Sequence, residues 1–315
     1  MRGLGAYIMR GPLQAMLVTA ALALVSLVPI LGVVSMLSGA ALALVTLRHG
    51  ARQGITVLLG AGVITGVFMY FVFGAMALGF VFLLLWLPLL LLALVLRSSA
   101  SWSIVIDAAT ALGLAGIVVF YLLTGDPVQF WQNVLSQMVE LMSAQGGGME
   151  GMETIQNQLP MFSRWLTGML AGALVMGQIL SLMVGRWWQA LLYNPGGFRQ
   201  EFLELRQSRL AAMVLLAILV LSLPDLGGVS DMAGDMMIVM VTVYSIVGLA
   251  LVHALVDRTG RHVGWLVALY LFLFILPPQA MLLLASAGFA DSWVNFRRRL
   301  SSLQQKSDDD RNDNQ

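Results

Sequence analysis

Cysteine is absent from the 315 residues, which excludes disulfides, thiolate metal sites and cysteine nucleophiles. Lysine occurs once, as Lys306, so no glycine-rich loop can supply the lysine that contacts ATP phosphates in P-loop proteins. Any ATP hydrolysis coupled to this chain is therefore expected from another subunit. The sequence also lacks HExxH, GxSxG and paired intramembrane aspartates. We predict no enzymatic activity, no cofactor and no metal site.

Charge is scarce as well: charged residues make up only 10% of the chain, whereas 59% of the residues are hydrophobic. A soluble domain carries about 25% charged residues, and lipid leaves few places where a charge is tolerated. The deficit extends over most of the length and predicts an all-α, polytopic transmembrane helical bundle. We expect a multi-pass protein of a bacterial cytoplasmic (inner) membrane, in contact with the lipid bilayer. The formal net charge of +1 gives no reason to expect a nucleic-acid partner.

Ten apolar runs are long enough, or nearly so, to cross roughly 30 Å of hydrocarbon. Two pairs are short and broken at Pro29 and at Pro277 and Pro278, so we predict a tight helical hairpin at each break. The alternative, one long kinked helix for each pair, gives eight spans. The ten predicted spans are 13–28, 30–47, 54–73, 75–96, 102–123, 163–192, 209–224, 235–256, 263–277 and 279–295.

The arginines give these spans a direction. If the N-terminus is cytoplasmic and ten spans alternate, Arg164 is the only one of 17 basic residues that falls outside. This distribution matches the positive-inside rule and predicts that both termini are cytoplasmic. The predicted organisation is a six-span unit (1–192) with an external amphipathic loop (125–162), a cytoplasmic interfacial elbow (193–208), an additional four-span unit (209–296) and a disordered tail (297–315).

Three polar or amphipathic residues are candidates for ligand binding. Asp107 lies inside a span, where a carboxylate is a functional candidate by default, although an ion pair with Arg97 is the alternative. Gln178 lies near the middle of the sixth span, where it binds either a ligand or a neighbouring helix. Trp131 belongs to an amphipathic stripe in the outer loop, which either lies on the bilayer surface or forms a lid over an external cavity.

Ala15, Thr19 and Ala23 form a stripe of small residues on the first span. Such stripes allow two helix backbones to approach closely. The stripe therefore serves either packing within the chain or docking of a partner membrane subunit.

The segment "GRWWQALLYNPGGFRQEF" places aromatic residues where the sixth span meets the cytoplasmic headgroups. Trp187, Trp188 and Tyr193 precede a turn at 194–197, and Arg199 lies on the charged face of the helix that follows. The segment is an interfacial elbow, and its size also makes it a candidate docking surface for a partner.

Two stretches carry a resemblance to known families. The run "LSGAALALVTLRHGARQGITVLLGAGVITGV" (37–67) resembles the second-to-third helix region of energy-coupling-factor transporter S components. The ending "GFADSWVNFRRRL" (288–300), with Asp291 and Arg297, is similar to the C-terminal signature of the YybS-like family of uncharacterised bacterial membrane proteins, which distantly resembles the S components. The resemblance implies an S-component-like unit whose first-span stripe docks a transmembrane coupling subunit.

These observations leave two hypotheses about function. The first is a substrate-binding or transport component for a small molecule that works with a partner ATPase. The alternative is a non-transporting membrane scaffold or cell-envelope assembly protein.

Overall fold

The computed structural model describes residues 2–144, 149–224, 226–260, 262–294 and 296–297. Over these ranges the chain contains helices and connecting turns and no strand, which confirms the predicted all-α class. Within the same ranges, six helices are long and apolar enough to cross a membrane. They are Ile30–His49, Ala51–Phe73, Gly79–Ser99, Trp102–Thr124, Gln158–Tyr193 and Gly228–Thr259.

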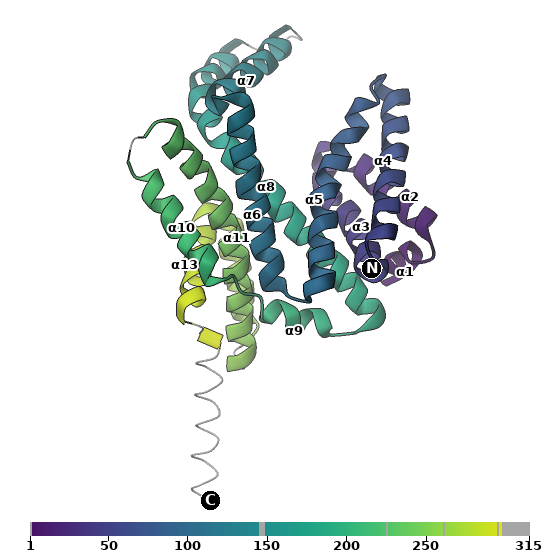
Figure 1. Cartoon of the computed structure of the whole chain (residues 1–315). Helices are drawn as coiled ribbons and strands as arrows, with labels where there is room; N and C mark the ends of the chain where they lie inside the picture. Colours follow the sequence, from purple (N-terminus) through teal and green to yellow (C-terminus); the bar gives the residue numbers. More distant parts are fainter. Residues whose placement is uncertain (1, 145–148, 225, 261, 295, 298–315) are drawn as a thin grey trace, which may run out of the picture.

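The helices follow one another with short connections (Figure 1). In chain order they are α1 (Arg2–Ile8), α2 (Pro12–Val25), the 3₁₀ helix η1 (Pro29–Val34), α3 (Ser35–His49), α4 (Ala51–Phe73), α5 (Ala77–Ser99), α6 (Trp102–Thr124), α7 (Pro127–Ala144), α8 (Met149–Tyr193), α9 (Gly197–Leu203), α10 (Arg209–Ser222), α11 (Gly228–Thr259), α12 (Gly264–Ile275) and α13 (Pro277–Val294).

Both predicted proline breaks produce hairpins. The Ser38 hydroxyl on α3 donates to the Thr19 carbonyl on α2 at 2.7 Å, so the chain has turned back at η1. At the other break, Gly288 lies beside Tyr244 and Gly248, and the Arg297 carbonyl accepts from Arg258. Helices α11 and α13 therefore run in the same direction, and α12 between them runs the opposite way.

Three of the apolar helices are short for a membrane span. Helices α2 and α10 have 14 residues each and α12 has 12, which gives lengths of roughly 18–21 Å at 1.5 Å per residue. Length and composition together thus support six spans, and the count of ten stays a prediction.

Helix α8 is the longest element of the fold. It has 45 residues and continues through Pro160, so it begins well before the predicted span 163–192. The half of α8 nearer Pro160, called outer after the predicted orientation, packs on α11, where Gly168 and Gly172 lie beside Asp235 and Thr242. Its inner half packs on α3. Figure 1 shows α8 passing from α6 and α11 at one end to α3 and α1 at the other.

The hydrophobic core extends across the predicted boundary between 1–192 and 209–296. Val175 and Ile179 on α8 share one buried cluster with Val243 and Val247 on α11. Helices α1 to α5 surround a second cluster, which the inner end of α8 joins through Trp188. The two predicted units therefore pack against each other through α8, and whether they fold as separate domains stays a prediction.

Most of the basic residues that the structure describes gather at one end of the bundle. Arg97 donates to the carbonyls of Leu47 and Arg48 at this end. Helix α9 lies at the same end (Figure 1). Arg164 lies at the opposite end, where it pairs with Asp231 at the beginning of α11. The fold thus has the charge asymmetry that the positive-inside prediction requires, and the side on which each end lies stays a prediction.

Candidate ligand-binding cavity

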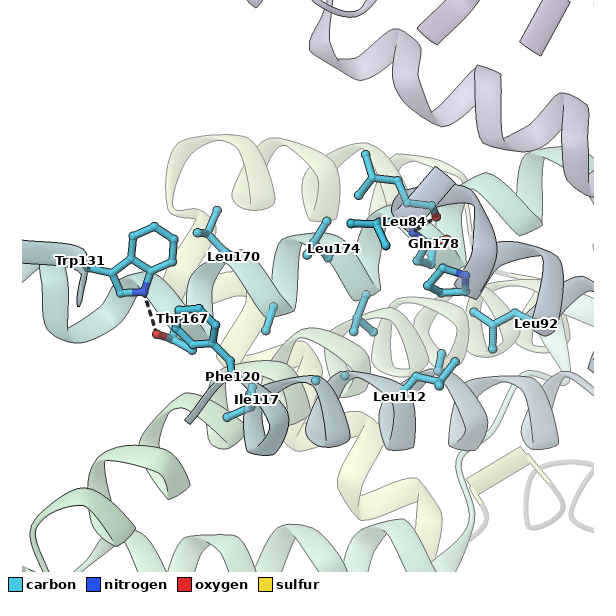
Figure 2. Close-up of a pocket in the computed structure, with 17 residues that line it drawn as sticks. Leu84, Leu92, Leu112, Ile117, Phe120, Trp131, Thr167, Leu170, Leu174 and Gln178 are labelled. Carbon is cyan, nitrogen blue, oxygen red and sulfur yellow. Dashed lines mark hydrogen bonds between the residues drawn. The ribbon is translucent and has the colours of Figure 1, made fainter. Parts of the chain in front are cut away.

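An apolar cavity lies between α5, α6 and α8, with α7 at its outer end (Figure 2). Its volume is about 400 Å³, within the range of small-molecule sites. Most of the lining is aliphatic. The lining residues are Leu84, Leu85, Pro88, Leu92, Ala109, Leu112, Gly113, Gly116, Ile117, Phe120, Trp131, Thr167, Leu170, Ala171, Leu174, Val175 and Gln178.

Two glycines on α6 shape the wall of this cavity. A Cβ atom at Gly113 would lie 2.5 Å from Cγ2 of Val175, so this position must stay small for α6 and α8 to approach. A Cβ atom at Gly116 would meet nothing within 4 Å, because Gly116 faces open space. A larger residue at Gly116 would extend into the cavity.

A tryptophan from α7 lies over the outer end. The Trp131 indole N–H donates to the Thr167 hydroxyl on α8 at 2.9 Å, and the Phe120 ring on α6 stacks on Trp131 at 5.7 Å. Figure 2 shows Trp131, Thr167 and Phe120 together at this end. The hydrogen bond to Thr167 and the ring contacts with Phe120 thus connect helix α7 to the cavity.

Gln178 marks the inner end of the same cavity. Its Nε2 donates to the Leu85 carbonyl on α5 at 2.9 Å, so it makes the contact to a neighbouring helix that the sequence offered as one alternative. Pro88, which also lines this end, lacks an N–H, so the carbonyl of Leu84 loses its regular helical donor. The Gln178 Oε1 is buried and has no hydrogen-bond partner among the described residues.

Asp107 lies outside the cavity. Its carboxylate accepts from the backbone N–H of Ser208 at 3.3 Å, just before α10 begins. The alternative pairing with Arg97 does not form, because Arg97 binds the Leu47 and Arg48 carbonyls instead. The structure therefore brings Trp131 and Gln178 to one cavity and gives Asp107 a contact with the elbow.

The stripe of small residues on α2 is buried inside the chain. Ala15 and Thr19 are 0% exposed and Ala23 is 1% exposed, and α2 packs on α3 and α4. The stripe thus serves the internal packing that was the alternative to docking. A partner could contact it only if α2 left these neighbours.

The aromatic residues of the elbow divide into two groups. Trp187 and Tyr193 are 36% and 47% exposed, as expected for side chains at headgroups. Trp188 is only 1% exposed, because α1 packs against the inner end of α8 and Gly5 lies beside it. Nothing in the apolar pattern predicted that this short N-terminal helix folds back.

The turn and the following helix form as predicted. Gly196 has a φ of 90°, a conformation that favours glycine, and α9 begins at the next residue. Arg199 pairs with Asp257 at the inner end of α11. This exposed ion pair links the elbow to α11.

A half-buried carboxylate organises the same region. Glu201 accepts from the Arg186 Nε at 2.9 Å and from the Trp102 indole N–H at 3.0 Å. Burial alone raises the pKa of Glu201, but the hydrogen bonds from Arg186 and Trp102 outweigh it, so the pKa lies below its usual value of 4.5. The charged form of Glu201 therefore joins α6, α8 and α9.

The two residues of the C-terminal signature form a buried ion pair. Arg297 Nη1 lies 3.4 Å from the Asp291 carboxylate, and the two side chains are 4% and 1% exposed. Arg297 also donates to the Leu205 carbonyl at 2.9 Å. Burial lowers the pKa of Arg297 to about 10, with Asp291 acting in the opposite direction. This pair connects the end of α13 to the elbow.

The sequence matches a known protein family. Residues 16–292 match the model of a family described as "Predicted membrane protein (DUF2232)". The chain belongs to this family. No curated protein and no solved structure matches it. The matched range contains every residue that lines the cavity, and together with the apolar helices it identifies a multi-pass membrane protein.

A second polar feature, near the beginning of α11, was not predicted from the sequence. Asp235 is 3% exposed and accepts from the Tyr121 hydroxyl at 2.7 Å and from the Gly168 N–H at 2.8 Å. A cavity of about 1050 Å³ opens beside it, between α8, α10, α11 and α13. The predicted span began at Asp235, whereas α11 begins at Gly228 and carries this carboxylate into the bundle. The four-residue spacing from Asp231 was the available signal.

Within the described residues, no group of three or more His, Asp or Glu side chains could hold a metal ion. The polar atoms of the cavity are an amide, a hydroxyl and an indole N–H. Such a set recognises a ligand by shape and hydrogen bonding.

Proposed function

We propose that this protein is a substrate-binding component of a bacterial inner membrane. It takes a small, largely apolar molecule into the cavity between α5, α6 and α8. The observation that carries the proposal is the cavity itself, which has about 400 Å³, an aliphatic lining and a hydrogen-bonded tryptophan at its outer end. The lining leucines Leu84 and Leu174 are 71% and 49% exposed, so the cavity is open toward the bilayer, from which an apolar molecule can enter.

A partner ATPase supplies the energy in this proposal. The chain's single lysine, Lys306, gives it no P-loop of its own. The exposed side chains of Trp187, Tyr193 and Arg199 at the inner end provide a surface for the coupling subunit. The resemblance of 37–67 to S components, and of the C-terminal ending to the YybS-like family, supports the same assignment.

The cavity can be tested by filling it. Gly116→Leu places a side chain in the open space, and Ala111→Leu adds the same side chain at an exposed position of α6 that does not line the cavity. The probe is a hexadecyl chain that carries a photoreactive diazirine, added to membranes that contain the full chain. We expect saturable crosslinking in the wild type and in Ala111→Leu, and at least a tenfold loss in Gly116→Leu.

Crosslinking that never saturates, or that is equal in all three proteins, would reject the cavity as a binding site. In parallel, mild crosslinking in cells followed by purification of the full chain should recover an ATPase. Recovery of envelope assembly proteins without an ATPase would favour the scaffold alternative, for which the exposed inner surface is also suited.

A further inference from the structure

The shape of the cavity limits the ligand that it can hold. Thr167 at the outer end and Gln178 at the inner end are eleven residues apart on α8, which corresponds to roughly 16 Å along a helix. The side chains between them are aliphatic, and Figure 2 shows them along α8 between the two ends. An elongated apolar space of this kind fits a hydrocarbon chain better than a compact ring system.

The inner end offers an acceptor. The Leu85 carbonyl can only accept, so the Gln178 Nε2 must face it at 2.9 Å and the Oε1 must point the other way. This Oε1 is buried and has no hydrogen-bond partner among the described residues. A buried acceptor without a donor is costly. Because protein atoms enclose this oxygen, a ligand hydroxyl would satisfy it only after the Gln178 side chain turns toward the cavity.

A second, smaller chamber continues beyond Gln178. It has a volume of about 170 Å³ and shares Leu85, Leu174 and Gln178 with the cavity. Its lining includes the hydroxyl-bearing residues Ser35, Ser38 and Ser181. The polar end of a ligand therefore has hydroxyl partners on the far side of Gln178, and the chain has an aliphatic lining on the near side.

Charge is missing from both chambers: as far as the structure describes them, none of their lining residues is Asp, Glu, Lys, Arg or His. An unpaired charge in such surroundings is strongly unfavourable. A carboxylate or phosphate head would in addition face the Oε1 of Gln178, an acceptor. The polar head group of the ligand must therefore be neutral and must donate a hydrogen bond.

We infer that the ligand is a long-chain alcohol, whose hydroxyl donates to the Gln178 Oε1 and whose chain extends toward Trp131. This assignment rests on the proposed function and adds the chemical class of the substrate and its orientation. Gln178 acts as the specificity-determining residue, positioned by the Leu85 carbonyl beside Pro88.

Competition against the hexadecyl diazirine tests the head group. Unlabelled hexadecanol, hexadecyl methyl ether and hexadecanoate are compared on the full chain in membranes. We expect hexadecanol to compete about tenfold more strongly than the ether, which cannot donate, and hexadecanoate to compete least. In Gln178→Leu the alcohol and the ether should become equal, whereas Ala111→Leu should keep the wild-type ratio.

Orientation is tested on the wild type alone, so the result does not depend on how Gln178→Leu folds. A hexadecanol with its diazirine beside the hydroxyl should label peptides that contain Leu85 or Ser181. A hexadecanol with its diazirine at the chain end should label peptides that contain Trp131 or Thr167. The reversed pattern, or equal competition by alcohol and ether in the wild type, would overturn the inference. Those outcomes leave the proposed function standing if Gly116→Leu still blocks saturable labelling.

Discussion

Single polar side chains decide where the helices of this bundle meet. Gln178 joins α8 to α5, Asp235 joins α11 to α6 and α8, and Glu201 joins α9 to α8 and α6. The sequence could single out Gln178 because a polar residue is rare in the middle of an apolar run. It could not single out Asp235, because hydropathy placed that residue at the edge of a span and the donors come from two distant helices.

Glu201 gives the fold a dependence on pH. Its pKa is lowered in the folded protein, so the stabilisation is present above the usual value of 4.5 and is lost as the pH falls through the folded pKa. We expect Glu201→Gln to unfold more easily at pH 7, by about 1.5–3 kcal/mol, the range for hydrogen bonds to charged groups. Thermal unfolding in detergent between pH 3 and 7 would measure this. Glu204→Gln, at an exposed position nearby, should keep the wild-type pH dependence.

Asp235 should matter far more than its neighbour Asp231. Asp235→Ala leaves the Tyr121 hydroxyl and the Gly168 N–H without their acceptor, so we expect a loss of about 2–5 kcal/mol. Asp231→Ala removes only an ion pair with Arg164, whose side chain is 65% exposed, and should cost less than about 1 kcal/mol. Equal unfolding temperatures for the two variants would show that Asp235 does not hold the three helices together.

Glycines allow pairs of helices to approach closely, and this matters as much as apolar contact between side chains. Gly248 on α11 and Gly288 on α13 face each other, and a Cβ at Gly288 would lie 2.6 Å from the Tyr244 carbonyl oxygen. Close backbone approach of this kind is a main source of helix association in lipid. The sequence reveals which helices are rich in glycine, but it cannot tell which partner each glycine faces.

The crossing of α11 and α13 gives a prediction with an internal control. Gly288→Ala should force the two helices apart and destabilise the protein by about 1–3 kcal/mol. Gly234→Ala, on α11 where a Cβ meets nothing within 4 Å, should be neutral or stabilising by up to about 1 kcal/mol. The midpoints of thermal unfolding of both variants test this prediction. An unchanged midpoint for Gly288→Ala would contradict the close packing of α11 and α13.

For the whole molecule, composition predicted the helical class, and the positions of proline and glycine predicted both hairpins and the elbow turn. These features depend on local composition and on proline and glycine, which one sequence displays directly. The burial of Trp188 under α1 and the extension of α8 to Met149 depend on packing between distant segments. Hydropathy alone contains no information about such contacts.

The absence of cysteine makes the predicted orientation simple to test. Ser98→Cys and Asn194→Cys lie at exposed positions at the arginine-rich end, and Ser230→Cys lies near the opposite end. In intact cells, a membrane-impermeant maleimide should label residue 230 and should label residues 98 and 194 only after the membrane is opened. Labelling of residues 194 and 230 from the same side would overturn the orientation.

Helix α8 is continuous, so it connects the elbow rigidly to the tryptophan contact at the other end of the cavity. One unbroken helix carries Thr167 under the tryptophan and Arg186 in the elbow, about 28 Å apart at 1.5 Å per residue. The described backbone has no hinge between these two residues to absorb a displacement. A displacement of the elbow would therefore be transmitted along α8 to the contact between Thr167 and Trp131.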